Sequence, residues 1–262
     1  MRRGTLITQE LCKLLFELSN QDRLNILFEL SKNPLRLSRV SEKFTFTVPE
    51  TARNLTRLTE TGLITKDVEG YFHLTPLGEA SLQLIPSFEF ISKNTKYFKN
   101  HSISNLPREY VASIGCLKKS EFISQLTEAM FIAEKMTRKS DEFVWISIDE
   151  ILASLLPVFI EAVNRGVELK KLMPRNAVIP PDILKLANDP AFDRGARVKK
   201  VESRYLDQID FFLLMSEKEL EIGFKNSDGI FDHVGFFRST DETAIKWTKS
   251  LFLNYWETAK RE

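Results

Sequence analysis

Apolar residues recur at helical spacing through the first sixty residues, and short polar breaks interrupt the pattern. The breaks at Ser19-Asn20 and Asn33-Pro34 predict the ends of two amphipathic helices, because proline cannot continue a helical hydrogen-bond ladder. An N-cap at Thr8 is expected to start the first helix. Its buried side is predicted to comprise Leu11, Leu14, Leu15 and Leu18.

A short helix is predicted over residues 37–44 and a longer one from about 48 to 61. Thr47 has the chemistry of an N-cap, with Pro49 in the first turn and Glu50 completing a capping box. Gly62 ends the long helix, and residues 63–68 and 71–75 read as two strands joined by a turn. This order of elements predicts a winged helix-turn-helix over residues 1–80.

Residues 75–101 keep a helical pattern, which Pro86 is expected to kink or split. We interpret residues 81–106 as a helical linker, whose phenylalanines either pair across a dimer or pack on their own domain. The polar stretch from 100 to 107 is the expected domain boundary.

From residue 107 to 262 the pattern predicts an α/β domain with a mixed sheet. A strand, a helix and a second strand at this spacing predict a right-handed βαβ unit. The expected helices cover residues 121–137, 151–165 and 241–259, and the expected strands cover 143–148, 167–173, 197–202, 210–215, 219–225 and 235–238, with 174–195 irregular or helical.

The net charge of the 262 residues is only +1, so the distribution of charged residues along the chain is more informative than their sum. Between Lys32 and Leu58, six basic residues face two acidic ones, which is typical of a nucleic-acid footprint but also of a solvated helix face. The two cysteines, Cys12 and Cys116, are interpreted as small core residues. The chain shows no signal peptide and no apolar run long enough for a membrane span, so a cytoplasmic protein is expected.

The long helix is the candidate reader of double-stranded DNA. Thr51, Leu55 and Leu58 would face the core, and the opposite face would carry the polar residues. Arginine can bind guanine edges through two hydrogen bonds, and asparagine can bind adenine in the same way. The predicted DNA-binding residues are Thr47, Glu50, Arg53, Asn54 and Arg57 at this helix, Arg36, Arg39 and Lys43 on flanking phosphates, and Lys66 and His73 in the wing. A solvated surface role is the alternative for each.

Three phrases in register resemble winged helices of the arsenic-repressor type: DRLNILFEL at 22–30, ARNLTRLTETGLI at 52–64 and YFHLTPLGEA at 71–80. The resemblance implies this fold and DNA binding. The metal-ligating cysteine pair of the arsenic repressors is missing, so metal sensing is not implied.

The phrases RGVELKKL at 165–172 and WTKSLFLNYWETA at 247–259 resemble the C-terminal halves of archaeal winged-helix regulators. The methanogenesis (filament) regulator family, with its middle domain, is the nearer resemblance. Archaeal sugar-sensing regulators with a phospholipase-D-like effector domain are a more distant one. Both imply a transcription factor with an effector-binding or dimerising domain, and neither names a ligand.

The sequence contains none of the catalytic motifs considered below. None of His73, His101 and His233 begins a His-x-Lys-x(4)-Asp phrase, and no phosphate-binding glycine loop or nucleophile elbow occurs. Asp228, Asp232 and His233 invite a metal site, although a hairpin turn explains them more simply. We therefore expect no enzyme, no metal and no cofactor, with a divergent nuclease or hydrolase as the weakest alternative.

A small-molecule effector, where one binds, would meet the carboxyl ends of the parallel strands. The residues predicted there are Ser147, Asp149, Pro174 and Arg175, and Arg175 has the fork geometry that holds an anion. The sequence predicts a homodimeric, DNA-binding transcriptional regulator, because one winged helix reads few base pairs. The alternative from another class is a protein-interaction module that uses the winged helix to bind a partner.

Overall fold

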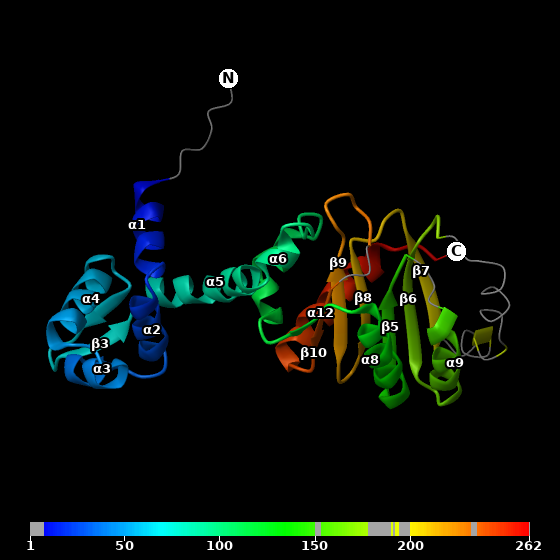
Figure 1. Cartoon of the computed structure of the whole chain (residues 1–262), viewed down its shortest axis with the longest axis horizontal. Coiled ribbons are helices and arrows are strands. Elements are labelled where there is room, and N and C mark those ends of the chain that lie inside the picture. The colour runs from blue at the N-terminus through cyan, green and yellow to red at the C-terminus, as the bar shows by residue number, and fades with distance from the viewer. Residues whose placement is uncertain are drawn as a thin grey trace, which may run out of the picture. The chain divides into compact units, whose positions relative to one another are not determined.

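The chain divides into two compact units, Met1–Ile85 and Pro86–Glu262. The computed structural model describes residues 8–149, 153–177, 190, 192–193, 200–231 and 235–261. Each unit combines helices with its own β-sheet, so the two-domain arrangement of mixed helices and sheets expected from the sequence is confirmed (Figure 1).

The first unit packs its helices on a small antiparallel sheet of order β1-β3-β2. One cluster of buried apolar side chains, including Ile26, Val40, Leu55 and Phe72, joins them. The elements are α1 (Gln9–Leu18), α2 (Gln21–Leu30), β1 (Leu35–Arg36), α3 (Leu37–Phe44), α4 (Val48–Glu60), β2 (Ile64–Lys66), β3 (Tyr71–Leu74) and the start of α5 (Pro76–Lys93).

Helix ends in this unit follow the local chemistry of the sequence. The Thr47 side chain accepts a hydrogen bond from the Glu50 backbone N–H, and the Glu50 carboxylate accepts one from the Thr47 N–H, so the predicted capping box is confirmed. Gly62 follows α4 with a φ of +75°, a conformation that glycine adopts without strain. Thr8 caps α1 as expected.

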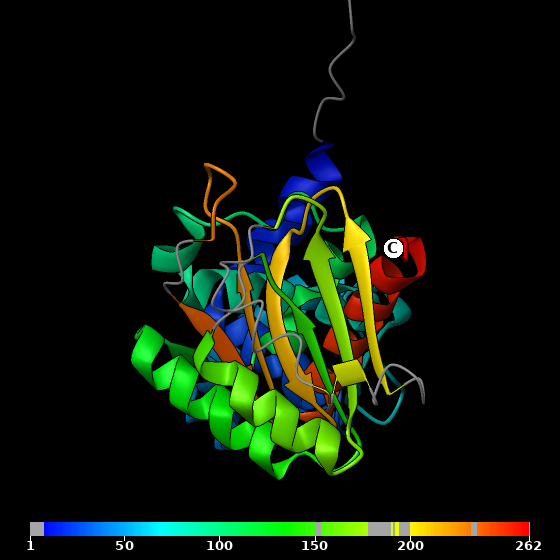
Figure 2. The same ribbon diagram turned by 90° about the vertical axis from the view of Figure 1, so that its right-hand side faces the viewer.

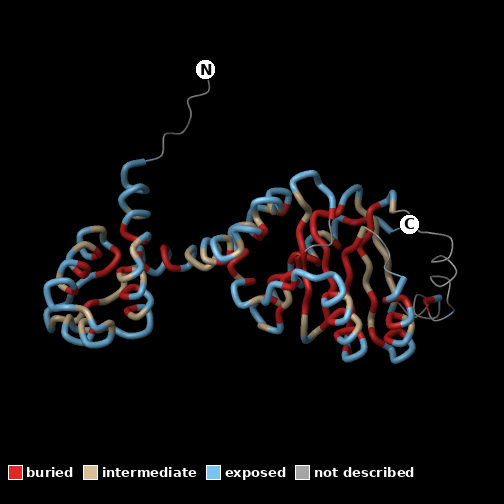
Figure 3. The backbone as a smooth tube through the Cα atoms, viewed as in Figure 1, coloured by how far each residue is buried: buried red, intermediate tan, exposed pale blue. Residues whose placement is uncertain are grey.

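The first helix differs from its prediction. Only Leu18 is buried and Leu14 half-buried, while Leu11 and Leu15 are 44% and 47% exposed (Figure 3). The predicted four-leucine face is therefore wrong, because α1 meets the core of its unit only near its C-terminal end. Cys12 is also exposed, so its interpretation as a core residue is wrong, and Cys116 is only half-buried.

The helix α5 runs through Pro86 and ends at Lys93, so of the two expected effects of Pro86 the split is wrong and the kink stays a prediction. The backbone of the segment after it passes close to α5: a Cβ on Gly115 would lie 2.4 Å from the Pro86 carbonyl carbon. The segment interpreted as a linker also contributes to the core of the second unit through Phe90, Tyr97 and Leu106.

The second unit is built on a seven-stranded mixed sheet of order β4-β10-β9-β8-β5-β6-β7. The three strands β5, β6 and β7 are parallel, as the predicted βαβ unit requires, and the other pairs are antiparallel. The strands are β4 (Glu121–Ile123), β5 (Phe143–Ser147), β6 (Glu168–Pro174), β7 (Val201–Leu206), β8 (Phe211–Ser216), β9 (Leu220–Phe224) and β10 (Phe236–Ser239).

Helices cover both faces of this sheet (Figure 2). On one face, α8 and α9 pack with Ile132, Phe159 and Leu214 in one buried cluster. On the other face, Trp247 and Phe252 of α12 pack against aromatic residues of the strands in a second cluster. The helices are α6 (Thr95–Phe98), α7 (Arg108–Ala112), the 3-10 helix η1 (Ile114–Leu117), α8 (Leu126–Lys139), the 3-10 helix η2 (Ala153–Leu155), α9 (Leu156–Asn164) and α12 (Glu242–Thr258).

Two predicted elements of the second unit have wrong bounds. Residues 121–123 form the edge strand β4 rather than the start of a helix, because they pair with β10. The strand expected at 197–202 is β7, Val201–Leu206, and its first three predicted positions lie outside the described residues, as do 178–189 of the stretch expected to be irregular. Asp232 and His233, weighed above as metal ligands, also lie outside them.

Candidate nucleic-acid interface

The outer face of α4 presents one unengaged arginine. Arg53 is exposed and, within the described part of the chain, makes no ion pair or hydrogen bond through its side chain. Thr51, Leu55 and Leu58 are buried on the inner face, as predicted. Arg53 therefore keeps all its guanidinium donors available for a ligand.

Asn54 does not share this face. It is 8% exposed, so the prediction that it lies with Arg53 on the outside of α4 is wrong. The reason is helical geometry: Asn54 follows Thr51 by three residues and precedes Leu58 by four, and both of those positions face the core. Its amide is not presented to a partner.

Arg57 is held inside its own unit. Its Nη2 donates to Oε1 of Glu17 at 2.5 Å and its Nε donates to Oε2 at 3.1 Å, and the guanidinium lies 5.2 Å from the centre of the Phe16 ring. The hydrogen bond that Arg57 donates to Glu17 raises the pKa of Arg57. Sequence patterns missed this contact, because Glu17 lies forty residues away along the chain.

The flanking cations on α3 lie in ion pairs. Lys43 donates to Glu29 at 2.7 Å, and Arg39 donates to Glu42 at the same distance. Hydrogen bonds from Lys43 and then from Lys32 hold the pKa of Glu29 below its ordinary value. The Arg39–Glu42 pair is exposed on both sides and contributes little to stability, whereas Glu29 beside Lys43 is only 15% exposed.

The remaining predicted contacts lie at the hairpin. Arg36 stacks 4.5 Å from the Tyr71 ring centre, on the strand paired with β3. His73 donates from Nε2 to Asp67 at 2.7 Å, and this bond lowers the pKa of Asp67. Lys66 extends over the Phe72 ring. The structure thus brings these side chains to one sheet and engages most of them with neighbours.

The residues predicted to bind an effector lie at the carboxyl ends of β5 and β6, two adjacent parallel strands. Ser147 is buried and donates its hydroxyl to the Phe211 carbonyl, and Pro174 is buried in β6. Arg175 is exposed and donates to Asp207 at 3.1 Å. Asp149 is half-buried. These residues share one end of the parallel strands.

Lys171, which the sequence did not single out, lies on β6 near this edge. Burial lowers its pKa, and its Nζ lies 5.3 Å from the Phe192 ring centre. No described carboxylate pairs with it. A negatively charged ligand beside this amine would favour its protonated form.

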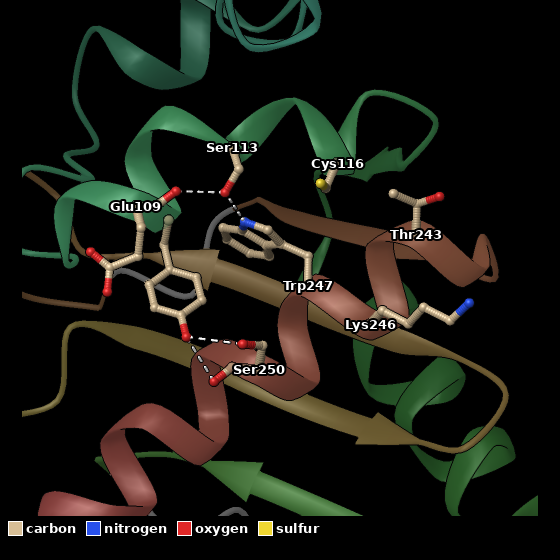
Figure 4. Close-up of a pocket in the computed structure, with 8 residues that line it drawn as sticks. Glu109, Ser113, Cys116, Thr243, Lys246, Trp247 and Ser250 are labelled. Atoms are coloured by element: carbon tan, nitrogen blue, oxygen red, sulfur yellow. Dashed lines mark hydrogen bonds between the residues drawn. The ribbon is translucent and has the colours of Figure 1, made fainter. Parts of the chain in front are cut away.

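A shallow hollow of about 470 Å³ lies elsewhere in the second unit, between α7, η1 and α12 (Figure 4). Trp247 Nε1 donates to the Ser113 hydroxyl at 2.9 Å, and the Tyr110 hydroxyl donates to the Ser250 carbonyl at 3.0 Å. Burial raises the pKa of the Cys116 thiol at its wall. Because the polar groups of the floor bond to one another, they are not left for a ligand.

The described residues contain no group of three or more His, Cys, Asp or Glu side chains placed to hold a metal ion. Among them, no helix is long and apolar enough to cross a membrane.

Solved structures offer only weak similarities. The archaeal chromatin protein TrmBL2, whose structure is described as showing a novel mode of DNA binding, is 16% identical with a TM-score of 0.45, over 97% of this chain and 100% of that one. Nuc from Salmonella typhimurium, a phospholipase D family member, is 8% identical with a TM-score of 0.40, over 55% of this chain and 97% of that one. These TM-scores are too low to support a conclusion about function.

Sequence comparison is more informative. The methanogenesis regulatory protein FilR1 of Methanothrix harundinacea (strain 6Ac) is 25% identical over 223 residues, which cover 78% of this chain and 48% of the relative. The chain thus spans about half the length of the curated relative it matches. Residues 132–258 match the family described as the methanogenesis regulatory protein FilR1, middle domain. The resemblance seen in the sequence is confirmed, and it covers residues 132–258 of the second unit.

Proposed function

We propose that the protein is a transcriptional regulator, in which residues 1–85 form a winged helix-turn-helix that binds double-stranded DNA. The observation that carries the proposal is the exposed, unengaged Arg53 on the outer face of the capped helix α4. A helix of thirteen residues with a free arginine on its outer face fits the major groove, where arginine binds guanine O6 and N7. The matched regulator FilR1 supports the same function.

The other cations of the first unit are proposed to bind the phosphates of the DNA backbone. Arg39 and Lys43 lie on α3, before the turn that leads into α4, and exchange their carboxylate partners for phosphates. Arg36, Lys66 and His73 lie on the small sheet and contact the backbone or an adjacent minor groove. Glu50 and Thr47 hold the helix start, which leaves base reading mainly to Arg53.

A salt titration with DNA from upstream of the gene tests this function. The unsubstituted chain is expected to bind with an affinity that falls steeply as salt rises, because bound phosphates release counterions. Arg53→Ala is expected to cost roughly 1–3 kcal/mol and to relax the preference for specific DNA. Arg108→Ala, which removes an exposed charge from α7 of the second unit, is the matched control. Absence of DNA binding at low salt would favour the protein-interaction alternative.

The outer face of α1 supports a homodimer. Leu11, Cys12, Leu15 and Phe16 are exposed at spacings that place them together, and Phe16 is 60% exposed. Two-fold symmetry doubles the DNA site, so a second copy is the partner that the function requires. Leu15→Glu is expected to yield monomers in light scattering after size exclusion, and a dimer that survives both Leu11→Glu and Leu15→Glu would refute this interface.

The second unit is assigned a regulatory, non-catalytic role. Lys171 and Arg175, both on or just after β6, support an anionic effector at the edge predicted from the sequence. Inorganic phosphate is the probe: it is expected to raise the melting temperature of the parent and not of Lys171→Met. An equal rise in both proteins would remove Lys171 from the effector site.

A further inference from the structure

Glu17 joins three helices of the first unit through a single carboxylate. It lies at the C-terminal end of α1 and is 5% exposed. Oε2 lies 2.7 Å from Nε of Arg23 on α2, and both oxygens accept hydrogen bonds from Arg57 on α4. Arg23, itself 7% exposed, also donates to the main-chain oxygen of Phe16 at 2.9 Å.

The two arginines on α4 are therefore in different situations. Arg53 lies one turn before Arg57, and its guanidinium has no partner within the described chain. Arg57 uses a bidentate contact on Glu17, which orients its planar fork toward α1. Glu17 takes the Nε/Nη2 edge of this guanidinium, so only its Nη1/Nη2 edge is left for another partner.

We infer that Glu17 is a positioning residue for DNA recognition: it holds Arg57 and so fixes the orientation of α4, and Arg57 itself does not contact DNA. This inference rests on the proposed function. The N-terminal end of α4 is fixed by the Thr47–Glu50 capping box, and the pair with Glu17 fixes the other end. With both ends held, Arg53 meets the groove in a defined direction.

Orientation matters because bidentate readout requires two aligned hydrogen bonds. The helix α4 spans about 20 Å at 1.5 Å per residue, so a small tilt at its last turn displaces a side chain near its middle. Glu17 contacts α4 through Arg57, one turn after Arg53, and in this way controls how Arg53 is presented. The carboxylate therefore determines specificity through Arg57.

The test is a double-mutant cycle on the full chain. Glu17→Gln, Arg57→Ala and the double variant are compared with Arg53→Ala as the matched arginine on the same helix. Dissociation constants are measured across a salt series, for the specific DNA and for a scrambled duplex of equal length. Far-UV circular dichroism and the unfolding midpoint establish that each variant is folded at the assay temperature. Arg57→Lys, which keeps the positive charge and lacks the planar guanidinium, replaces any variant that is unfolded.

Glu17→Gln and Arg57→Ala are each expected to weaken specific binding about tenfold, and the double variant no more than either one, because the residues act as a unit. The slope of affinity against salt is expected to stay at the parent's value, since no phosphate contact is lost. Arg57→Lys is expected to lie between Arg57→Ala and the parent. Glu17→Gln and Arg53→Ala together are expected to reduce the specificity ratio no further than Arg53→Ala alone.

Two results would overturn the inference while leaving the proposed function intact. One is a salt slope that falls by about one phosphate in Arg57→Ala and not in Glu17→Gln, which would make Arg57 a DNA contact. The other is unchanged specific binding in Glu17→Gln. If the unsubstituted chain binds no DNA at all, the proposed function fails, and the inference fails with it.

Discussion

Among the described residues, each unit buries one glutamate, and the surroundings of the two are opposite. Glu17 of the first unit is 5% exposed and both carboxylate oxygens are bonded to arginines. Glu221 on β9 of the second unit is 1% exposed, and its Oε1 has no hydrogen-bond partner within the described residues. The nearest cation in register, Arg238 on β10, pairs instead with Glu219 and Glu121.

The surroundings of a buried acid determine its protonation state. Glu17 lies where three helices meet, and two of them supply guanidinium groups that replace the lost water. Glu221 lies inside a sheet, where burial first and then the negative charge of Glu219 raise its pKa to about 8. At neutral pH the first unit therefore contains a buried ion network, and the second contains a buried neutral carboxylic acid.

Glu221→Gln tests the contrast between the two glutamates with the largest expected effect on stability. The pKa of Glu221 is raised from 4.5 in the unfolded chain to about 8 in the fold, so its favourable contribution is complete below pH 4.5. That contribution falls as the pH rises and is lost above about 8. The glutamine variant does not titrate, so at pH 9 it is expected to be more stable than the parent by up to about 5 kcal/mol.

Denaturant unfolding of the second unit at pH 5 and pH 9 measures this effect. The difference between variant and parent is the quantity of interest, since it cancels the titration of all other groups. Glu142→Gln, an exposed glutamate of the same unit, is the control and is expected to show no such trend. An equal pH dependence in Glu221→Gln and the parent would show that Glu221 is ionised and paired like Glu17.

Arg23→Met tests the other half of the comparison. The substitution replaces the guanidinium by an apolar side chain of similar length. It leaves the buried carboxylate with only Arg57, and it removes the Arg23 donor from the Glu17 main-chain oxygen and from that of Phe16, which keeps the Ser19 hydroxyl. Breaking one side of a buried ion pair is expected to cost about 3 kcal/mol. Urea unfolding of the first unit measures this loss.

Lys13→Met, on the exposed side of α1, serves as its control and is expected to change stability little. A gain in stability for Arg23→Met would mean that the network costs more in desolvation than it returns, as hydrophobic replacements sometimes reveal. Glu17 would then resemble Glu221 in energetic terms in spite of its partners.

Local chemistry explains why so much of the first unit could be predicted. The capping box at Thr47, the glycine at Gly62 and the turn before Tyr71 each act within four residues, so the bounds of α3 and α4 agree with the sequence to within a residue. Two-residue β1 gives no such signal and was missed. Asn54 was misplaced because a polar residue on the inner face of a helix looks exposed in a pattern of polarity.

Long-range contacts could not be read from the sequence. Glu17 meets Arg57 across forty residues, and β4 becomes a strand only through pairing with β10, more than a hundred residues later. The candidate effector residues were placed correctly at strand ends, but the Ser147 hydroxyl donates its hydrogen bond to the main chain of β8. Tertiary partners, not local propensity, decided each of these positions.

Thr47→Ala gives the smallest expected effect and sharpens the comparison within the first unit. It removes the side-chain acceptor at the N-terminal end of α4 and leaves the Glu17–Arg57 pair at the other end intact. Loss of such a cap costs about 1 kcal/mol, less than the buried ion network, because the freed N–H can bond to water. Urea unfolding measures it against Thr56→Ala, an exposed position in the middle of the same helix. A loss for Thr47→Ala as large as that for Arg23→Met would mean that the helix start, and not the buried glutamate, holds α4 in place.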